Sequence, residues 1–98
     1  MSLPLAYLPE AEEDITAVFR SYQAEKPELG ERFKVSLRAA LDKIAERPKA
    51  YAPYWRDVRT ALIYKFPYVV YFRLESDHVL IIAIRHGRQS SRGWKSRA

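Results

Sequence analysis

The chain has no cysteine, and its 98 residues include only three glycines and one methionine. Without cysteine there can be no disulfide and no thiolate metal site, a composition that suits a reducing cytoplasm. The scarcity of glycine, with 30% charged and 48% hydrophobic residues, is typical of a folded globular chain rather than a disordered one. A chain of this length has room for one hydrophobic core, so we expect one domain over residues 1–98.

Long hydrophobic segments are also missing. The longest apolar run, Val79–Ile84, is far too short to span a bilayer. The start of the chain lacks the charged segment and long apolar core of a secretory signal peptide. We therefore expect a cytoplasmic protein without a membrane partner. The two histidines, His78 and His86, have no carboxylates at ligand spacing, so we expect no metal and no cofactor.

Acidic residues are absent from the segment 85–98, which holds all the excess positive charge. The chain carries 17 basic and 12 acidic residues, a formal net charge of +5. Five of the basic residues lie in this segment: Arg85, Arg88, Arg92, Lys95 and Arg97. Subtracting them leaves 12 basic against 12 acidic residues, so the rest of the chain is neutral. A local field of one sign favours polyanions or an acidic protein segment, although a solvated tail would have the same composition.

The first half of the chain predicts a strand and two helices. Leu3–Leu8 is expected at a sheet edge, because Pro4 cannot donate a hydrogen bond to a neighbouring strand. Hydrophobic periodicity predicts helices over residues 9–23 and 29–46, and the short turn between them makes an antiparallel hairpin. Acidic residues gather where the dipole of the first helix is positive: Glu10, Glu12, Glu13 and Asp14.

The second half predicts a loop over residues 49–57 and strands over 58–64, 68–74 and 78–85. The unbroken apolar stretch of the last strand indicates burial on both faces. The element order is then β-α-α-β-β-β. We expect an α+β fold in which an antiparallel sheet packs against a two-helix hairpin. The expected core contacts join the second helix to the sheet: Leu37, Leu41 and Ile44 against Val70, Ile82 and Ile84.

Three local patterns, in their order and spacing, resemble the RelE/ParE superfamily of toxins from bacterial type II toxin–antitoxin modules. They are Phe66–Tyr71 (FPYVVY), Ile82–Arg88 (IAIRHGR) and Arg92–Arg97 (RGWKSR). The third is similar to the Trp–x–x–Arg ending common in ParE-like members. The resemblance extends over nearly the whole chain and implies the fold of that superfamily.

The resemblance implies two alternative activities. RelE-like members are ribosome-dependent endonucleases of messenger RNA, whereas ParE-like members bind DNA gyrase and turn it into a source of DNA breaks. Members of both kinds are held inactive by an antitoxin that wraps the toxin and also binds operator DNA. Operator binding by this chain would therefore come only through its antitoxin.

RNA cleavage needs a group that activates the 2′-OH, cations for the transition-state charge and an acid for the leaving oxygen. RelE-like nucleases typically carry an arginine on the third strand where this chain has Val69, and lysines on the second strand where it has Thr60 and Leu62. The set is incomplete, so the ParE-like interpretation is favoured: a toxin that acts by binding, with a ParD-like antitoxin. If the chain is instead a nuclease, the candidate catalytic residues are Arg59, His86 and Arg88. A structural role for His86, fixing the tail at the strand end, is the alternative.

The basic tail is the predicted target-binding segment: Arg85, Arg88, Arg92, Trp94, Lys95 and Arg97. Trp94 either docks back on the domain or anchors a partner, and guanidinium groups can bind carboxylates bidentately. An aromatic loop is predicted to contact the antitoxin, with packing beneath the helices as the alternative: Tyr51, Tyr54, Trp55 and Arg56. A plain nucleic-acid-binding domain would explain the tail charge but not the three patterns.

Overall fold

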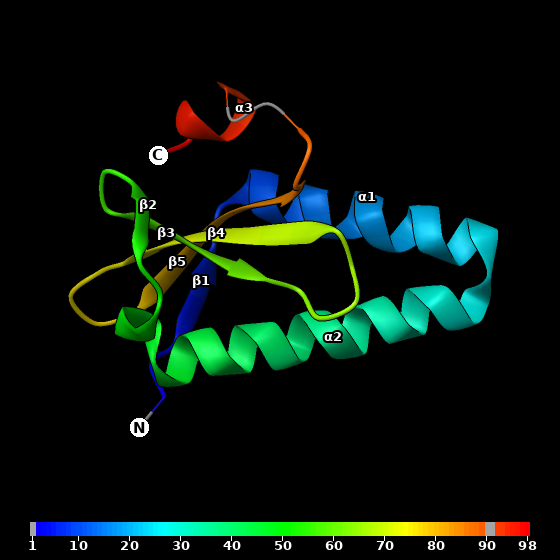
Figure 1. Ribbon diagram of the computed structural model, residues 1–98, viewed down its shortest axis with the longest axis horizontal. Coiled ribbons are helices and arrows are strands. Elements are labelled where there is room, and N and C mark those ends of the chain that lie inside the picture. The colour runs from blue at the N-terminus through cyan, green and yellow to red at the C-terminus, as the bar shows by residue number, and fades with distance from the viewer. Residues whose placement is uncertain (1, 90–91) are drawn as a thin grey trace.

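The structure is a computed structural model that describes residues 2–89 and 92–98, without the side chain of Arg92. Its elements follow one another as shown in Figure 1: β1 (Leu5–Tyr7), α1 (Pro9–Glu25), α2 (Pro27–Glu46), the 3-10 helix η1 (Pro48–Ala50), β2 (Pro53–Trp55), β3 (Val58–Leu62), β4 (Tyr68–Leu74), β5 (Val79–His86) and α3 (Arg92–Lys95). The predicted α+β class and the predicted helix hairpin are confirmed.

The five strands form one sheet in the order β1-β5-β4-β3-β2. β1 lies at an edge, as Pro4 predicted. The expectation that the sheet is wholly antiparallel needs correction, because β1 pairs with β5 in parallel, with Leu5 opposite Val79. No turn joins these two strands, since residues 8–78 lie between them, so nothing local in the sequence fixes their relative direction.

The helix hairpin is closed by a single residue. Lys26 has an extended backbone, its N–H donates to the carbonyl of Tyr22, and a proline stands at the start of each helix, Pro9 and Pro27. Proline suits this position because the first helical N–H has no partner within the helix. The hairpin therefore turns sharply, and its closed end projects beyond the sheet (Figure 1).

The main core lies between the helices and one face of the sheet. Its largest contributions come from α2, through Phe33, Leu37, Leu41 and Ile44, and from β4 and β5. The predicted core residues of α2 are thus confirmed, and so are Val70 and Ile84 in the sheet. The other residues that β3, its C-terminal flank, β4 and β5 contribute to this cluster are Ala61, Ile63, Phe72, Val79 and Ile81.

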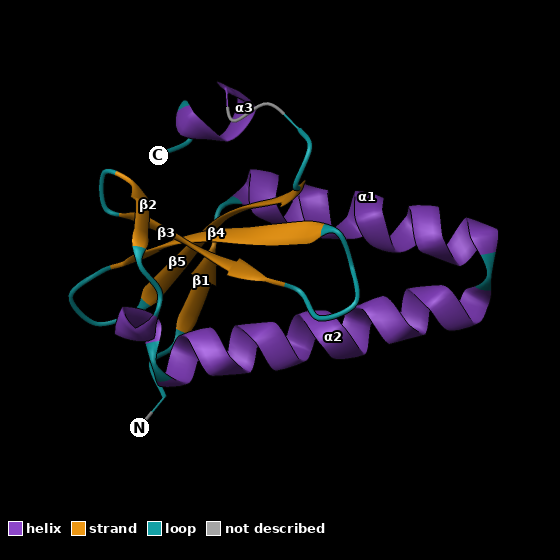
Figure 2. Ribbon diagram, in the orientation of Figure 1, coloured by secondary structure: helices purple, strands orange, loops and turns teal. Residues whose placement is uncertain are grey.

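The predicted placement of Ile82 is wrong, because its side chain lies on the other face of the sheet. Tyr71 is opposite Ala83 and Phe72 is opposite Ile81, so Ile82 is an extra residue in β5, a β-bulge. It joins a second cluster with Val58, Tyr71, Ala83 and Trp94. The predicted burial of β5 on both faces is confirmed, since every residue of Val79–Ile84 except Leu80 is buried. Figure 2 shows the short α3 across the strands from α2.

Three short elements were not predicted. The expected loop 49–57 overlaps η1 and contains the strand β2, which is held by the pairs Pro53–Arg59 and Trp55–Val58. The tail contains α3, which spans only four residues. Elements this short show no hydrophobic periodicity, because one helical turn or a few strand residues do not repeat a pattern.

We expect Leu41→Ala to lower the free energy of unfolding by about 2–5 kcal/mol, because Leu41 is only 6% exposed and its removal leaves a cavity. Leu62→Ala is the matched control: Leu62 is 79% exposed, and its loss should change stability by less than about 0.5 kcal/mol. Urea denaturation followed by circular dichroism measures both. If Leu41→Ala lowered the free energy of unfolding by less than about 1 kcal/mol, this face of α2 would not pack against the core.

Candidate functional site

The basic tail is docked on the sheet through Trp94. This side chain has 0% exposure. Its ring stacks on Tyr71, with centroids 4.4 Å apart, and meets the ring of Trp55 edge-on at 5.6 Å. Burial raises the pKa of the Tyr71 phenol, because the ionised form is poorly solvated there. Of the two alternatives for Trp94, docking therefore describes its position, and any part it has in target binding stays a prediction.

The terminal arginine of the tail is held in an ion pair. Arg97 Nη1 donates to Asp14 Oδ2 at 2.7 Å and Nη2 to Oδ1 at 3.3 Å. The side chains of Arg97 and Asp14 are only 14% and 15% exposed. Within the tail, Arg97 N–H also donates to the carbonyl of Trp94, so the two residues belong to one turn of chain. The Trp–x–x–Arg pattern thus places a buried aromatic ring and a largely shielded cation within one turn of chain.

The other tail cations differ in exposure. Arg85 is half-buried and packs against Gly93. A Cβ atom at position 93 would lie 3.3 Å from both Nη atoms of Arg85, which is a tight contact. Arg88 is exposed, and Lys95 is half-buried with its Nζ 5.1 Å from the ring centre of Trp55. The predicted contribution of the Arg92 side chain lies outside the described part of the chain. The tail therefore presents Arg88 and Lys95, whereas Arg97 is engaged internally.

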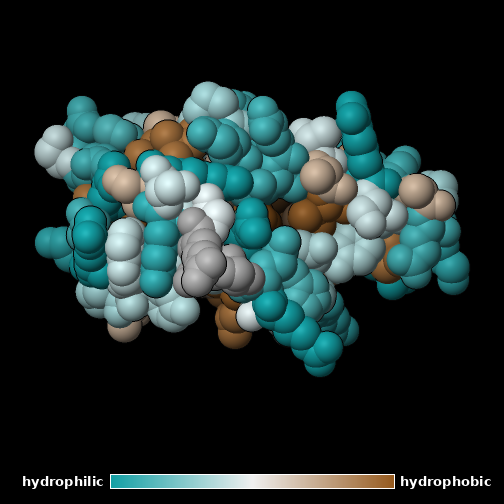
Figure 3. Space-filling model, turned by 90° about the horizontal axis from the view of Figure 1, so that it is seen from above, coloured by the Kyte–Doolittle hydropathy of each residue, from teal (hydrophilic) through white to brown (hydrophobic). Residues whose placement is uncertain are grey.

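The docked tail meets the predicted aromatic loop. Tyr54 lies 6.2 Å from Trp94 between ring centres, and the Arg56 guanidinium lies 4.5 Å from the ring centre of Trp55. We call Tyr54, Trp55, Arg56 and Lys95 the cation–aromatic ridge. Residues predicted as two separate sites, one for the antitoxin and one for the target, thus form one surface. Figure 3, viewed from the α3 side, shows mostly hydrophilic residues on this side of the molecule.

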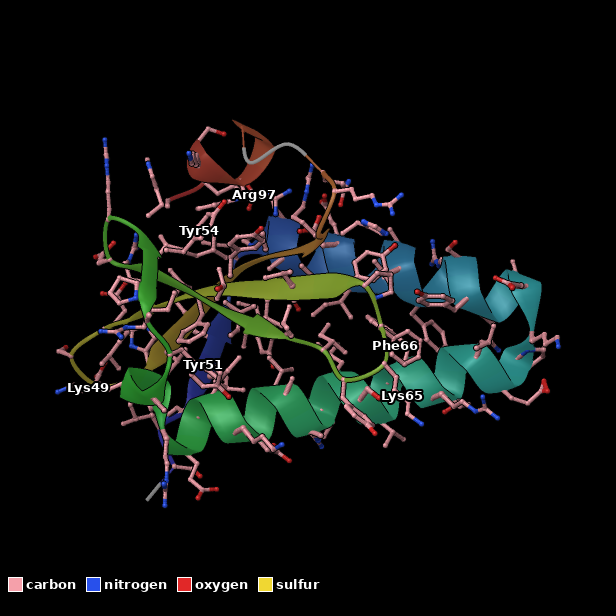
Figure 4. All side chains as sticks on the ribbon, in the orientation of Figure 1. Lys49, Tyr51, Tyr54, Lys65, Phe66 and Arg97 are labelled. Carbon is pink, nitrogen blue, oxygen red and sulfur yellow. The ribbon has the colours of Figure 1, made fainter. Side chains whose placement is uncertain are left out.

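Tyr51 lies away from the ridge. Its ring packs edge-on against Phe72, with centroids 5.6 Å apart, on the helix-covered face of the sheet. Figure 4 shows Tyr54 and Arg97 near α3 and Tyr51 toward α2. The predicted antitoxin-binding residues are therefore divided between two sides of the molecule, a separation that the sequence did not indicate.

A groove runs between α2 and β3. It consists of two adjoining hollows of about 600 and 420 Å³ that share Ser36 and Tyr64. Three of the four large hydrophobic residues that are exposed in the described part of the chain line it: Val35, Leu62 and Tyr64. We call it the α2–β3 groove. The groove was not predicted from the sequence, although one signal was present: Val35 is a β-branched apolar residue placed off the buried stripe of its helix.

The edge of β3 that borders this groove is partly open. Within the described residues, β2 pairs with β3 only at Val58 and Arg59. Ile63 N–H donates to the carbonyl of Tyr68 in the β4 direction, so the backbone groups of Leu62 point the opposite way, toward the groove. An extended peptide could pair there, because such an edge presents unpaired donors and acceptors.

The three candidate catalytic residues do not converge. Arg59 donates to the carbonyl of Tyr51 and is paired with Phe72 on β4, whereas His86 is paired with Tyr68. These partners, Tyr68 and Phe72, are four positions apart along β4, which corresponds to about 13 Å. His86 packs edge-on against Tyr68, and its Nδ1 accepts the N–H of Arg88 at 3.0 Å. These contacts fit the structural alternative for His86.

No group of three or more His, Asp or Glu side chains able to hold a metal ion occurs among the described residues. None of the described helices is both long and apolar enough to cross a membrane.

Trp94→Ala should lower the free energy of unfolding by about 3–5 kcal/mol, because the variant loses a fully buried aromatic ring. Tyr64→Ala is the control, since Tyr64 is exposed and its loss should change little. Thermal and urea denaturation compare the two. Equal stabilities for Trp94→Ala and the unsubstituted chain would show that the tail does not dock in solution.

Known proteins identify the family. A family model for the ParE toxin of type II toxin–antitoxin systems, parDE, matches residues 5–91. Two relatives, Toxin ParE2 of Mycobacterium tuberculosis strains CDC 1551 / Oshkosh and ATCC 25618 / H37Rv, are each 28% identical over 80 residues, 81% of this chain and 76% of theirs. A solved structure titled "Chromosomal ParDE TA system from P. aeruginosa" superposes with a TM-score of 0.75 at 18% identity, covering 87% of this chain and 96% of that one, which confirms the expected fold. The chain belongs to the ParE toxin family of type II toxin–antitoxin systems.

Proposed function

We propose that this ParE-family toxin acts in the cytoplasm by binding DNA gyrase, and that a cognate ParD-like antitoxin neutralises it. The observation that carries the proposal is the contrast between two sets of residues. The candidate nuclease residues Arg59 and His86 lie far apart, whereas the tail and the aromatic loop meet in one cation-bearing surface. A toxin that acts by binding needs a surface of this kind and no catalytic constellation.

The cation–aromatic ridge is suited to an acidic partner surface. Arg56 and Lys95 flank the ring of Trp55, and Tyr54 beside them is 60% exposed. The docking of Trp94 fixes the backbone that carries Lys95. A surface ordered before the encounter loses less conformational entropy on association than a flexible tail. Arg and aromatic residues are also the types most enriched at the energetic centres of interfaces.

The α2–β3 groove is suited to an extended segment of the antitoxin. Apolar side chains of such a segment would cover Val35, Leu62 and Tyr64, while its backbone would pair with the open edge of β3. Basic residues of the groove lining favour an acidic segment: Arg32, Lys43 and Lys65. The one acid of the lining, Glu31, is 3.7 Å from Lys34 Nζ and is partly neutralised by it. An antitoxin segment of this kind would order on binding.

Leu62→Glu should weaken antitoxin binding about 30-fold or more, because an interface residue at the centre of an apolar contact contributes about 2 kcal/mol or more. The partner is the product of the antitoxin reading frame beside the toxin gene, and calorimetry gives the affinity. Tyr54→Glu introduces the same charge on the ridge and serves as control, with a smaller expected effect. An unchanged affinity for Leu62→Glu would exclude the groove as the antitoxin site.

The purified chain should inhibit supercoiling by gyrase and cause DNA cleavage. The double variant Arg88→Glu/Lys95→Glu should be at least about tenfold weaker, because it inverts the charge of the exposed Arg88 and of the half-buried Lys95 beside Trp55. These substitutions are preferable to deleting residues 93–98, which would remove Trp94 from the core. The control Arg20→Glu/Lys49→Glu has the same net charge as this double variant, but its substitutions lie at exposed positions outside the tail and the ridge.

Ribosome profiling tests the alternative activity. Codon-phased cuts in messenger RNA together with unaffected gyrase would contradict the proposal and favour a nuclease. In that case His86→Ala should slow cleavage by about 10²–10⁴, the usual contribution of a general acid or base.

A further inference from the structure

We propose that Asp14 is a positioning residue of this toxin: with Arg97 it forms a latch on the open edge of β5 that holds residues 92–98, and therefore Lys95, on the sheet. The latch consists of the Asp14 carboxylate, the Arg97 guanidinium, the N–H of Ile84 and the carbonyl of Ile82. Its effect on the target rests on the function proposed above, whereas its effect on the tail does not.

The latch occupies the place of a missing strand. β1 pairs with β5 only over Val79–Ile81, and Leu8 N–H then donates to the carbonyl of Ile81 before the chain enters α1. The next edge groups of β5 are met by side chains instead. Ile84 N–H donates to Asp14 Oδ2 at 3.1 Å, and the Ile82 carbonyl accepts from Arg97 Nη1 at 3.2 Å. A carboxylate and a guanidinium thus supply the acceptor and the donor of a neighbouring strand.

The Asp14 side chain is turned inward, toward β5 and the tail. It is 15% exposed, whereas its neighbours in the acidic cluster, Glu10, Glu12 and Glu13, are exposed. Both oxygens of its carboxylate are within hydrogen-bond distance of Arg97. Asp14 would therefore affect a target bound to the ridge only by fixing the position of residues 92–98.

The positions of the acid and the base in the latch are not interchangeable. The backbone of β5 offers a hydrogen-bond donor, the N–H of Ile84, next to residue 14 and an acceptor, the carbonyl of Ile82, next to residue 97. An ordinary ion pair keeps its attraction when the two charges are exchanged. In the latch, exchange would place a guanidinium against the N–H of Ile84 and a carboxylate against the carbonyl of Ile82, two repulsive contacts. Exchange therefore separates a backbone-oriented latch from simple charge attraction.

The position of the latch along the tail makes it more than a stabilising contact. Trp94 anchors the segment on the sheet, and the latch anchors it three residues later, with Lys95 between the two. A further contact, Arg73 Nη1 to the carbonyl of Ala98 at 3.3 Å, is exposed and should hold the end only weakly. Loss of the latch should leave Trp94 as the single firm anchor and free the chain that carries Lys95 to move.

The experiment compares Asp14→Asn, Arg97→Lys and the exchange variant Asp14→Arg/Arg97→Asp with the control Glu13→Gln. Limited trypsin digestion measures cleavage after Lys95, because proteolysis of a fast-opening segment follows its open population. We expect Asp14→Asn and the exchange variant to be cut at least about tenfold faster than the unsubstituted chain. Arg97→Lys should be cut at a rate between that of the unsubstituted chain and that of these two variants, and Glu13→Gln should be cut at the unsubstituted rate. Antitoxin affinity should stay within about twofold for each, which also shows that each is folded.

Gyrase inhibition is the second measurement. Asp14→Asn should weaken gyrase inhibition at least about tenfold, although the Asp14 side chain is only 15% exposed and the net charge of the tail is unchanged. The latch would be overturned if Asp14→Asn were cut after Lys95 as slowly as the unsubstituted chain. It would also be overturned if the exchange variant were cut as slowly as the unsubstituted chain. Rapid cleavage with undiminished gyrase inhibition would overturn its positioning role. Failure of the unsubstituted chain to act on gyrase would instead reject the proposed function, and digestion would still decide whether the latch exists.

Discussion

The stacking of Trp94 on Tyr71 closes the second face of the sheet, and the rest of the tail depends on that contact. Helix α1 covers one face of β5, while Trp94 covers Ile82 and Ala83 on the other. Without the indole ring these side chains would meet water. A small domain buries a modest share of its surface on folding, so the loss of one large buried ring is a substantial part of its stability.

The same contact creates the surface that we assign to the target. Residues 54–56 and Lys95 are far apart in the sequence, and they become neighbours because Trp94 draws α3 onto the β2–β3 turn. Structure and proposed function are thus coupled in the tail: Trp94 and Arg97 are used internally, and their contacts place Lys95 beside Trp55.

The two proposed binding surfaces lie on different sides of the molecule. The α2–β3 groove belongs to the helix-covered side, and the cation–aromatic ridge belongs to the side of α3 (Figure 4). The sheet between them is packed on both faces. Substitutions in the groove and on the ridge share no side-chain partners, so their effects on antitoxin and target binding should be separable.

The sequence by itself determined the elements whose patterns repeat. Helical periodicity predicted the α1–α2 hairpin, the apolar run of β5 predicted burial on both faces, and Pro4 predicted an edge strand. The three quoted patterns also led to the right family. Tertiary structure alone decided the direction of β1, the side of the sheet on which Ile82 lies, and the presence of β2 and α3. Asp14 appeared in the sequence as one of four acids at a helix start. Its partner Arg97 lies at the opposite end of the chain, and only folding brings the two to the edge of β5, because no local pattern encodes a contact across that distance.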